Sequence, residues 1–526
     1  MVRDGAGPLP EHPAEVDIPR RSGEAVCVPP AAQLVALARE VGADLDRADV
    51  VLGGLPLRRL RAQAREEILA AAAAYTRGLG LDADIPPGRA PLVVTGHQPF
   101  LFHPGVWVKY LLAARLQDRG ALALGIPVDS DEAGEVGADA PASGPAGMVL
   151  AREVLVAAEP EVPYEALPAP SPDQWAAFLD RLQAHLEAVP LERAQAALRR
   201  FRELTVDLRA GDLGAFFTAA RHRYEGLRYL EVPVSILSRT DAFRRYALHL
   251  LGDADRFAAV YNRQLQAYRE RHGVRTRAQP FPDLERDDRG VEAPFWLLRA
   301  GRRLRVFVRR RRDRLVLAAD ADVAELSPGA GPQALEGLEL RPRALTLTLF
   351  TRLVVADLFL HGVGGGRYDR VTDAVIADYL GLAPPAYAVA TATLHLPLAA
   401  DDLRARRREL RQRLMRLQHN PDRVLDDPTP EQRALIEEKW SLVASLSSAA
   451  LTRRQRRQIT HRIREINAEL SRALGEQVER LSRQLRDLDR PATEAALAAA
   501  THRGYPYCYF PVDDVAALVD GLLSRP

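Results

Sequence analysis

The chain contains few of the residues that crosslink a protein or bind metals. Only two cysteines, Cys27 and Cys508, occur among 526 residues, so a disulfide framework is excluded. These cysteines and the scattered histidines give no zinc-ligand spacing, so we predict no metal-binding residues, and the metal dependence stays open. Low cysteine usage is typical of a reducing compartment. Because residues 1–30 lack the apolar core of a signal peptide, we expect a cytoplasmic location.

Long hydrophobic runs and an excess of one charge are also absent. No run of about eighteen uncharged apolar residues occurs, so we expect no membrane span. The 72 basic and 70 acidic residues leave a net charge of +2, which argues against a general nucleic-acid binder. Lysine is rare, with only Lys109 and Lys439 in an arginine-rich chain. A hydrophobic content of 47% and a charged content of 27% are typical of a globular protein in water.

Composition and periodicity divide the chain into four predicted segments. Residues 1–90 form an N-terminal arm and helix, in which proline and glycine over residues 1–45 favour an irregular arm. Residues 91–398 alternate strand and helix patterns and form a core with inserted connecting segments. Residues 399–490 form a helical coiled-coil arm, and residues 491–526 form a C-terminal return segment.

The strongest fold signal is a strand, a helix and a second strand near the start of the core. Apolar residues over 91–95 and 121–128 predict the strands, and residues 105–117 predict the helix between them. This spacing is typical of a βαβ unit with parallel strands. Residues 345–360 are predicted as a buried helix, and residues 386–394 as another strand. The predicted fold class is α/β, with a Rossmann-like parallel sheet core, inserted segments and a C-terminal α-helical coiled-coil arm.

The predicted arm carries apolar residues at heptad-like intervals. Leucines recur over residues 403–417, and isoleucine, valine and leucine recur at mostly three- and four-residue steps over residues 459–488. Residues 420–430 separate two helical stretches, which fold back on each other in an antiparallel hairpin in this interpretation. Because such arms commonly dimerise, we expect a homodimer.

The first candidate site is the loop between the first strand and the helix. Thr95, Gly96 and Gln98 offer hydrogen bonds to a substrate, while the imidazoles of His97 and His103 can donate to phosphate oxygens. The helix that follows adds the partial positive charge of its N-terminus. The loop loosely resembles the histidine-containing loop of nucleotidyltransferases and class I synthetases, which contact ATP phosphates. The alternative is that both histidines are ordinary polar loop residues above a hydrophobic plug.

The second candidate site is the acidic cluster after the next strand. Asp129, Asp131 and Glu132 are predicted at a strand end, where parallel sheets gather their ligand-binding groups. Carboxylates there can hold an ammonium group, a sugar hydroxyl or Mg²⁺. The alternative is a solvated acidic turn. Lys109, one turn into the preceding helix, is either a phosphate partner or a surface charge.

The third candidate site is a glycine-rich stretch, predicted as a loop between two helices. Gly364, Gly365 and Gly366 would let backbone N–H groups approach an anion closely. Arg367 would add a bidentate contact to that anion. The stretch is neither a P-loop nor a dinucleotide-binding fingerprint. A glycine cap with a flexible loop is the alternative.

Three pieces of the chain together resemble the bacillithiol biosynthesis cysteine-adding enzyme family, whose members are described as cysteine ligases. The family motif TGQQ, a hydrophobic pair and TGP is similar to residues 95–105, in which His97 and His103 replace a glutamine and a threonine. The family's acidic cluster is similar to residues 129–132, and its GGPGE segment to residues 364–366. The order of these pieces matches from about residue 93 to residue 488.

The resemblance implies a Rossmann-like core, a helical dimer arm and a ligase reaction. That reaction would join the cysteine carboxyl group to the amine of glucosaminyl-malate. Thr95, Gly96, Gln98 and the acidic cluster would line the substrate crevice, and the glycine-rich stretch would flank it. The many departures at matched positions indicate a divergent member of the family.

Our leading hypothesis is therefore a ligase that couples an amino acid to an amine-bearing sugar conjugate in thiol biosynthesis. His97 and His103 would stabilise phosphate or oxyanion charge, and Asp129 and Asp131 would orient the amine. The expected cofactor is ATP or another nucleotide, and the expected partners are small-molecule substrates and a second copy of the chain. Two alternatives are a nucleotidyltransferase that uses the same loop on ATP alone, and a non-catalytic scaffold that recruits partners through the coiled-coil arm.

Overall fold

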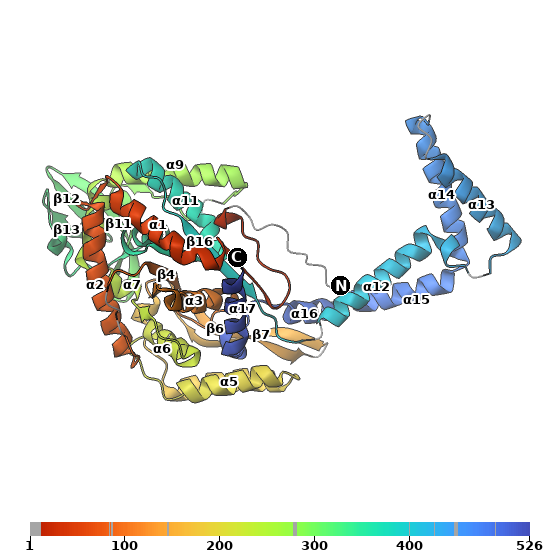
Figure 1. Ribbon diagram of the computed structural model, residues 1–526, viewed down its shortest axis with the longest axis horizontal. Coiled ribbons are helices and arrows are strands. Elements are labelled where there is room, and N and C mark those ends of the chain that lie inside the picture. The colour runs from red at the N-terminus through yellow and green to blue at the C-terminus, as the bar shows by residue number, and fades with distance from the viewer. Residues whose placement is uncertain are drawn as a thin grey trace. The chain divides into compact units, whose positions relative to one another are not determined.

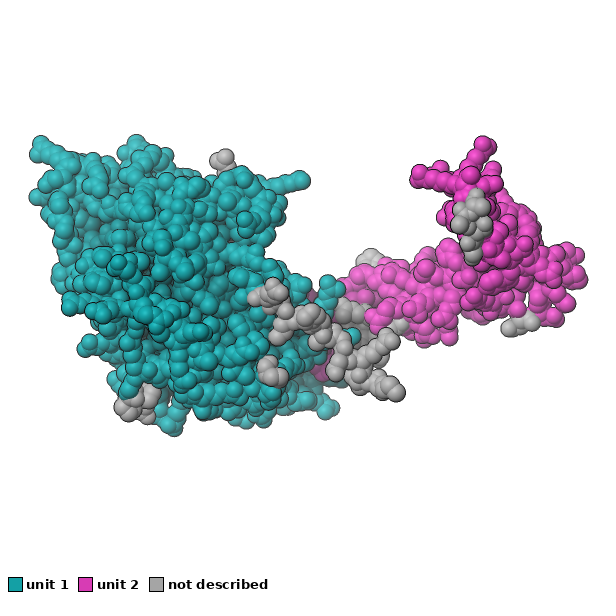
Figure 2. Space-filling model, turned by 45° about the horizontal axis from the view of Figure 1, so that its top comes forward, with its two compact units in different colours: residues 1–140, 152–395, 503–526 teal, residues 141–151, 396–502 magenta. Residues whose placement is uncertain are grey.

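The computed structural model describes most of the chain and divides it into two units. The described residues are 12–83, 85, 88–144, 147–276, 281–398, 400–425, 427–446, 451–489 and 491–525. The first unit contains the described residues up to 140, from 152 to 395 and from 503 onward. The second unit contains those at 141–151 and 396–502 (Figure 2). The residues predicted as the helical arm lie in the second unit.

The centre of the first unit is a six-stranded sheet. Its strand order is β1-β16-β15-β4-β5-β8, in which β1 is antiparallel to β16 and every other pair is parallel. The strands span Glu24–Val28 (β1), Leu92–His97 (β4), Leu122–Pro127 (β5), Leu230–Glu231 (β8), Leu358–His361 (β15) and Tyr387–Thr393 (β16). A mixed α/β fold with a sheet of parallel strands is therefore confirmed.

Two helices leave neighbouring strands toward opposite edges of this sheet. Helix α3 (Pro104–Leu116) joins β4 to β5, whereas α11 (Val363–Leu380) joins β15 to β16. Because β4 and β15 are adjacent, their carboxyl ends mark a point where the direction of strand connection reverses. Open α/β sheets bind their ligands in the crevice at such a point.

Helix α3 begins where the sequence predicts it, and its start has a physical reason. Pro104 occupies the first turn, where its missing N–H costs nothing. The His103 ring accepts a hydrogen bond of 3.0 Å from the backbone N–H of Gly105, so His103 acts as the N-cap. All but one residue of this helix are buried, which explains why it has little amphipathic pattern.

Two predictions about the first unit are wrong. Residues predicted as an irregular arm contain β1 and α1 (Leu34–Arg47), and β1 extends the sheet through β16. Residues 345–360, predicted as one helix, form α10 (Ala344–Phe350), a π-helical turn (Thr351–Val355) and strand β15. An apolar run buried on all sides has no periodicity that separates helix from strand, so its pattern was ambiguous.

Asp357 fixes the point at which this run becomes a strand. Its carboxylate accepts a hydrogen bond of 2.8 Å from the backbone N–H of Leu92 and pairs with Arg61 and Arg65 at 2.5 and 3.2 Å. These contacts tie the start of β15 to the start of β4. A smaller correction concerns the strand predicted over residues 229–237, which is the short strand β8 followed by α7 (Val234–Leu237).

The inserted segments build a second sheet and a set of helices. The second sheet is antiparallel, in the order β13-β12-β11-β10-β14, with β9 paired to β10. Its strands span Arg286–Asp287 (β9), Gly290–Arg299 (β10), Arg302–Arg311 (β11), Arg314–Ala318 (β12), Asp322–Leu326 (β13) and Leu340–Pro342 (β14). Two hairpins, β2–β3 and β6–β7, span Val51–Leu52, Leu55–Pro56, Glu135–Gly144 and Gly147–Ala157.

The other helices of the first unit pack against the sheets: α1 contacts β15, α2 contacts β8 and α9 contacts β10 (Figure 1). They span Leu57–Gly78 (α2), Pro172–Glu187 (α4), Glu192–Thr205 (α5), Leu213–Glu225 (α6), Asp241–Gly252 (α8), Ala254–His272 (α9) and Val512–Ser524 (α17). Helix α17 packs on α3 and β1, so the end of the described chain supports the central sheet. Tyr505, Tyr507 and Tyr509, just before α17, are fully buried.

The second unit is made mainly of helices. They span Ala400–His419 (α12), Pro430–Ser445 (α13), Arg453–Arg472 (α14), Gly475–Leu488 (α15) and Pro491–Ala500 (α16). Helix α12 packs along α15 and α14, and α13 packs along α14. Leu410, Leu417, Ile466 and Leu470 are buried between these helices. Across the described residues of both units, none of the helices combines the length and the apolar character needed to cross a membrane.

Candidate functional site

A cavity of about 320 Å³ opens at the carboxyl ends of β4 and β15, and we call it the crevice pocket. It lies at the reversal of strand connection, where the topology alone predicts a ligand site. Helix α10 and the first three turns of α11 complete its walls. Its polar lining includes Gly96, His97, Gln98, Asp131, His361 and Asp369.

His97 is the imidazole that the strand β4 places in the crevice pocket. Its ring lies 5.4 Å from the rings of both Phe100 and Phe102, and its Nδ1 is 3.1 Å from the carbonyl oxygen of Gln98. Desolvation, and next the charge of Lys109, lower the pKa of His97 to about 3. His97 is therefore neutral near pH 7, with Nδ1–H donating to the Gln98 carbonyl oxygen and Nε2 able to accept a hydrogen bond.

Gln98 and Asp131 link the ends of β4 and β5 across the pocket. The Gln98 amide donates a hydrogen bond of 2.8 Å to the Asp131 carboxylate. Arg303, from strand β11 of the second sheet, pairs with Asp131 and with Glu132 at 3.0 Å each. Asp131 thus lines the pocket with its charge balanced, whereas Glu132 serves to hold Arg303. The prediction that Glu132 contacts substrate is not supported by this placement.

Asp129 stabilises the fold, and it is not among the described residues that line the pocket. Its two carboxylate oxygens accept hydrogen bonds from the backbone N–H and the hydroxyl of Ser235, at the start of α7. Burial, and next the nearby Glu165 carboxylate, raise the pKa of Asp129 to about 7. The prediction that Asp129 and Asp131 act as a pair in one hollow is wrong, because the chain turns between them.

Three other residues of the predicted first site also support the backbone. The Thr95 hydroxyl donates a hydrogen bond of 2.8 Å to the carbonyl oxygen of Leu360 and so joins β4 to β15. The buried ammonium of Lys109 donates to the carbonyl oxygen of Gly96, and desolvation lowers its pKa to about 7. His103 caps α3 and is not among the described lining residues, so the two predicted imidazoles do not share one cavity.

The glycine-rich stretch is a strand-to-helix junction, which corrects its prediction as a loop between two helices. Gly364, Gly365 and Gly366 form the first turn of α11, directly after β15. Gly365 lines the crevice pocket, whereas a Cβ at Gly366 would lie 2.3 Å from a side-chain carbon of Val389. A Cβ at Gly364 would meet open space among the described residues.

Arg367 does not reach the pocket in this structure. Its guanidinium donates to the carbonyl oxygen of Val16 at 3.3 Å and pairs with Asp17 at 3.1 Å. It therefore holds the segment before β1 against α11. Its predicted role as an anion-binding residue is not supported by this placement.

The pocket contains a second histidine that the sequence analysis missed. His361 ends β15, and its Nε2 lies 2.8 Å from the Asp369 carboxylate on α11. Arg352, in the π-helical turn, pairs with Asp369 at 2.7 Å and with Asp373 at 2.8 Å. In the sequence, the pair of His361 and Asp369 is recognisable as a histidine that is followed by a glycine-rich turn and by an aspartate eight residues later. The incorrect prediction of a helix over residues 345–360 hid it.

The protonation states of this pair follow from their surroundings. Burial opposes ionisation of Asp369, but the Arg352 charge and the His361 contact outweigh it and lower the pKa of Asp369 to about 2. Burial lowers the pKa of His361 below its ordinary value, although Asp369 acts in the opposite direction. Near pH 7 the pair is therefore a carboxylate and a neutral imidazole.

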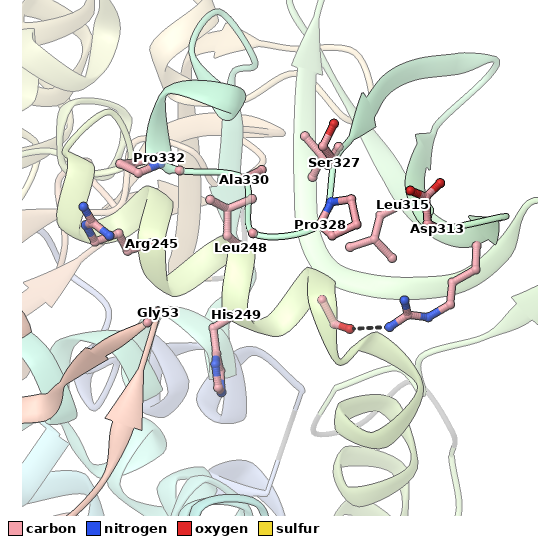
Figure 3. A pocket seen from close by; sticks show the side chains of 16 residues that line it. Gly53, Arg245, Leu248, His249, Asp313, Leu315, Ser327, Pro328, Ala330 and Pro332 are labelled. Atoms are coloured by element: carbon pink, nitrogen blue, oxygen red, sulfur yellow. Dashed lines mark hydrogen bonds between the residues drawn. The ribbon is translucent and has the colours of Figure 1, made fainter.

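A second cavity of about 440 Å³ lies away from the carboxyl ends of the parallel strands. Helix α8, the β2–β3 turn, the β11–β12 hairpin and residues 327–332 line it. In Figure 3 the charged side chains of Arg245 and Asp313 lie at opposite ends of this cavity, with Leu248 and Pro328 between them. Arg310 donates a hydrogen bond of 3.1 Å to the carbonyl oxygen of Gly252. Polar groups do not converge here as they do in the crevice pocket.

Metal ligands and known relatives do not add to this description. Within the described residues, no group of three or more histidine, cysteine, aspartate or glutamate side chains is placed to hold a metal ion. No protein-family model matches the chain, and no curated protein matches it. The candidate site therefore rests on the geometry of the crevice pocket.

Proposed function

We propose that the chain is a carbon–nitrogen ligase that joins the carboxyl group of an amino acid to the amine of a small acceptor. In this proposal the parallel sheet is a Rossmann-like core and the crevice pocket is its active site. One observation carries it: the segments after β4, β5 and β15 open on the same cavity, so that His97, Asp131 and His361 all line it. The resemblance to cysteine-adding enzymes makes cysteine and a glucosaminyl-malate-like acceptor the first substrates to test.

The pocket combines groups suited to an anion with groups suited to an amine. Backbone N–H groups in the first turn of α11 carry partial positive charge, and Gly365 lets a ligand approach them closely. Neutral His97, whose Nδ1–H donates to the Gln98 carbonyl oxygen, can accept a hydrogen bond at Nε2 from a hydroxyl or ammonium group of a substrate. The Asp131 carboxylate, held by Gln98, can orient an ammonium group. A bound nucleoside triphosphate would supply the energy that activates the carboxylate.

The helices of the second unit are proposed to form a coiled-coil arm through which two copies of the chain pair in the cytoplasm. Heptad-like spacing supports this proposal, and so do Leu481 and Leu485, which are only half-buried along α15. Sedimentation velocity of the full chain tests it. We expect the wild-type chain to sediment as a dimer and the double variant Leu481→Arg, Leu485→Arg to sediment as a monomer. A wild-type chain that stays monomeric at every concentration would contradict the arm's role.

The ligase proposal is tested by nucleotide consumption that needs both other substrates. The purified chain is incubated with ATP, cysteine and glucosaminyl-malate, and the release of ADP, AMP and pyrophosphate is measured. We expect release only when the amino acid and the amine are both present. His97→Ala and Asp131→Asn should lower the rate at least tenfold, whereas His249→Gln, in the second cavity, should leave it unchanged. Transfer of the nucleotide without an amino acid would favour a nucleotidyltransferase instead.

A further inference from the structure

The His361 side chain is positioned by a series of charged contacts that begins outside the crevice pocket. Arg352 is buried and pairs with two carboxylates of α11, those of Asp369 and Asp373. Asp369 in turn contacts Nε2 of His361 at 2.8 Å. Because an ionised carboxylate can only accept, Nε2 must carry the proton in the neutral ring. The lone pair of the neutral ring is then on Nδ1.

Nδ1 of His361 faces the one glycine of the turn that lines the pocket. A Cβ built at Gly365 would lie 2.8 Å from this nitrogen, which is closer than van der Waals contact allows. Glycine at this position therefore keeps the space in front of Nδ1 open. The other groups that surround the ring are Tyr387 and Phe359, whose rings lie 5.3 and 4.4 Å away, and the charge of Lys109 acts on it from α3.

We propose that His361 is the general base of the reaction, an inference that rests on the proposed ligase function. The amine nitrogen of the acceptor attacks the carbonyl carbon of the activated carboxylate, and a carbon–nitrogen bond forms. The carbon–oxygen bond to the phosphoryl leaving group breaks, and its electron pair leaves with that oxygen. The proton lost by the nitrogen passes to Nδ1 of His361. Asp369 is a positioning residue that fixes the tautomer and stabilises the imidazolium.

Three variants test this role through turnover in the ligase assay. His361→Gln should lower kcat by about 10²–10⁴ with little change in the KM for the nucleotide. Gly365→Ala, which keeps His361 but places a methyl group before Nδ1, should lower kcat as well. Asp369→Asn should shift the lower limb of the kcat/KM pH profile to lower pH, because the ring loses the carboxylate that raises its pKa against the effect of burial. His249→Gln is the matched control and should retain wild-type kcat.

A spectroscopic measurement separates failure of this inference from failure of the ligase proposal. Nitrogen NMR of protein with isotope-labelled histidine shows which ring nitrogen carries the proton near pH 7. The His361 signals are assigned as those that disappear in His361→Gln. We expect the Nε2–H tautomer, and a proton on Nδ1 would overturn the inference whatever the substrates are. If wild type turns over and His361→Gln keeps more than a tenth of its kcat, the inference also fails. If wild type turns over no pair of substrates, the ligase proposal fails and the general-base role falls with it, whereas turnover by wild type with the proton on Nδ1 overturns the inference alone.

Discussion

The two strand-to-helix junctions at the crevice pocket differ in how they are built. At the β4–α3 junction, most of the polar side chains support the backbone: Thr95 bonds to β15, His103 caps α3 and Lys109 bonds to Gly96. At the β15–α11 junction, a glycine leaves room for His361, and the charged side chains behind it hold that ring in place. The polar residues of the first junction therefore mainly stabilise the fold, whereas the second junction places a buried titratable group next to a glycine.

Asp357→Ala should give the largest loss of stability, because Asp357 joins the start of β15 to the start of β4. The change leaves the buried Arg61 without its closest carboxylate and frees the backbone N–H of Leu92. Breaking a buried ion pair by removing one partner costs about 3–5 kcal/mol. Urea unfolding should show a loss of this size, whereas Asp313→Ala, at an exposed position, should stay within about 0.5 kcal/mol of wild type.

Asp129→Asn should change how stability depends on pH. The folded-state pKa of Asp129 is raised to about 7, so between about pH 4 and pH 7 the folded chain holds a proton that the unfolded chain has lost. Stability therefore falls as pH rises through this window, by at most about 1.4 kcal/mol per pH unit from this group. Asparagine does not titrate and can keep both contacts to Ser235, so the variant should fold but lack this contribution to the pH dependence. An unchanged pH profile from thermal unfolding would contradict the burial of this carboxyl group.

The glycines of α11 provide a matched pair of substitutions within one helical turn. Gly366→Ala would place its Cβ 2.3 Å from a Val389 carbon, so α11 or β16 must shift at a cost of about 1–3 kcal/mol. Gly364→Ala meets open space among the described residues and should stabilise the helix by up to about 1 kcal/mol. The two substitutions should therefore change the free energy of unfolding, measured with denaturant, in opposite directions. Equal effects would show that the turn is not packed as described.

His103→Ala should have the smallest effect, because His103 acts at the helix terminus and outside the pocket. Loss of the N-cap hydrogen bond to Gly105 should cost about 1 kcal/mol of stability. Ligase turnover should fall less than threefold. A loss of turnover as large as that of His97→Ala would return His103 to the active site and remove the contrast between the two histidines.

Local patterns in the sequence were sufficient to predict much of the central sheet. The strands β4, β5 and β16 and the helix α3 lie where the apolar patterns predict them, because each pattern is bounded by turn residues. Strand β15 was not predictable in this way, since it continues an apolar helix with no glycine or proline at the boundary. The contact that ends the helical run, from Asp357 to Leu92, joins residues far apart in the chain.

The candidate site was predicted in part, because only some of its residues follow strands that local patterns in the sequence predict. Gly96, His97, Gln98 and Asp131 were found because they follow recognisable strands, and Gly365 because it lies in a glycine-rich stretch. His361 and Asp369 were missed because their pairing depends on β15 ending where it does. The supporting roles of Asp129 and His103 depend on Ser235 and on the start of α3, which composition does not show.

Both proposals require that ligands bind in the crevice pocket between β4 and β15. Hydrogen exchange of backbone amides, measured by mass spectrometry with and without saturating ATP and cysteine, tests it most directly. We expect slower exchange at residues 96–98 and at residues 362–366 together, with no change at residues 327–332 beside the second cavity. Protection at residues 327–332 alone, or at only one of the two junctions, would contradict it.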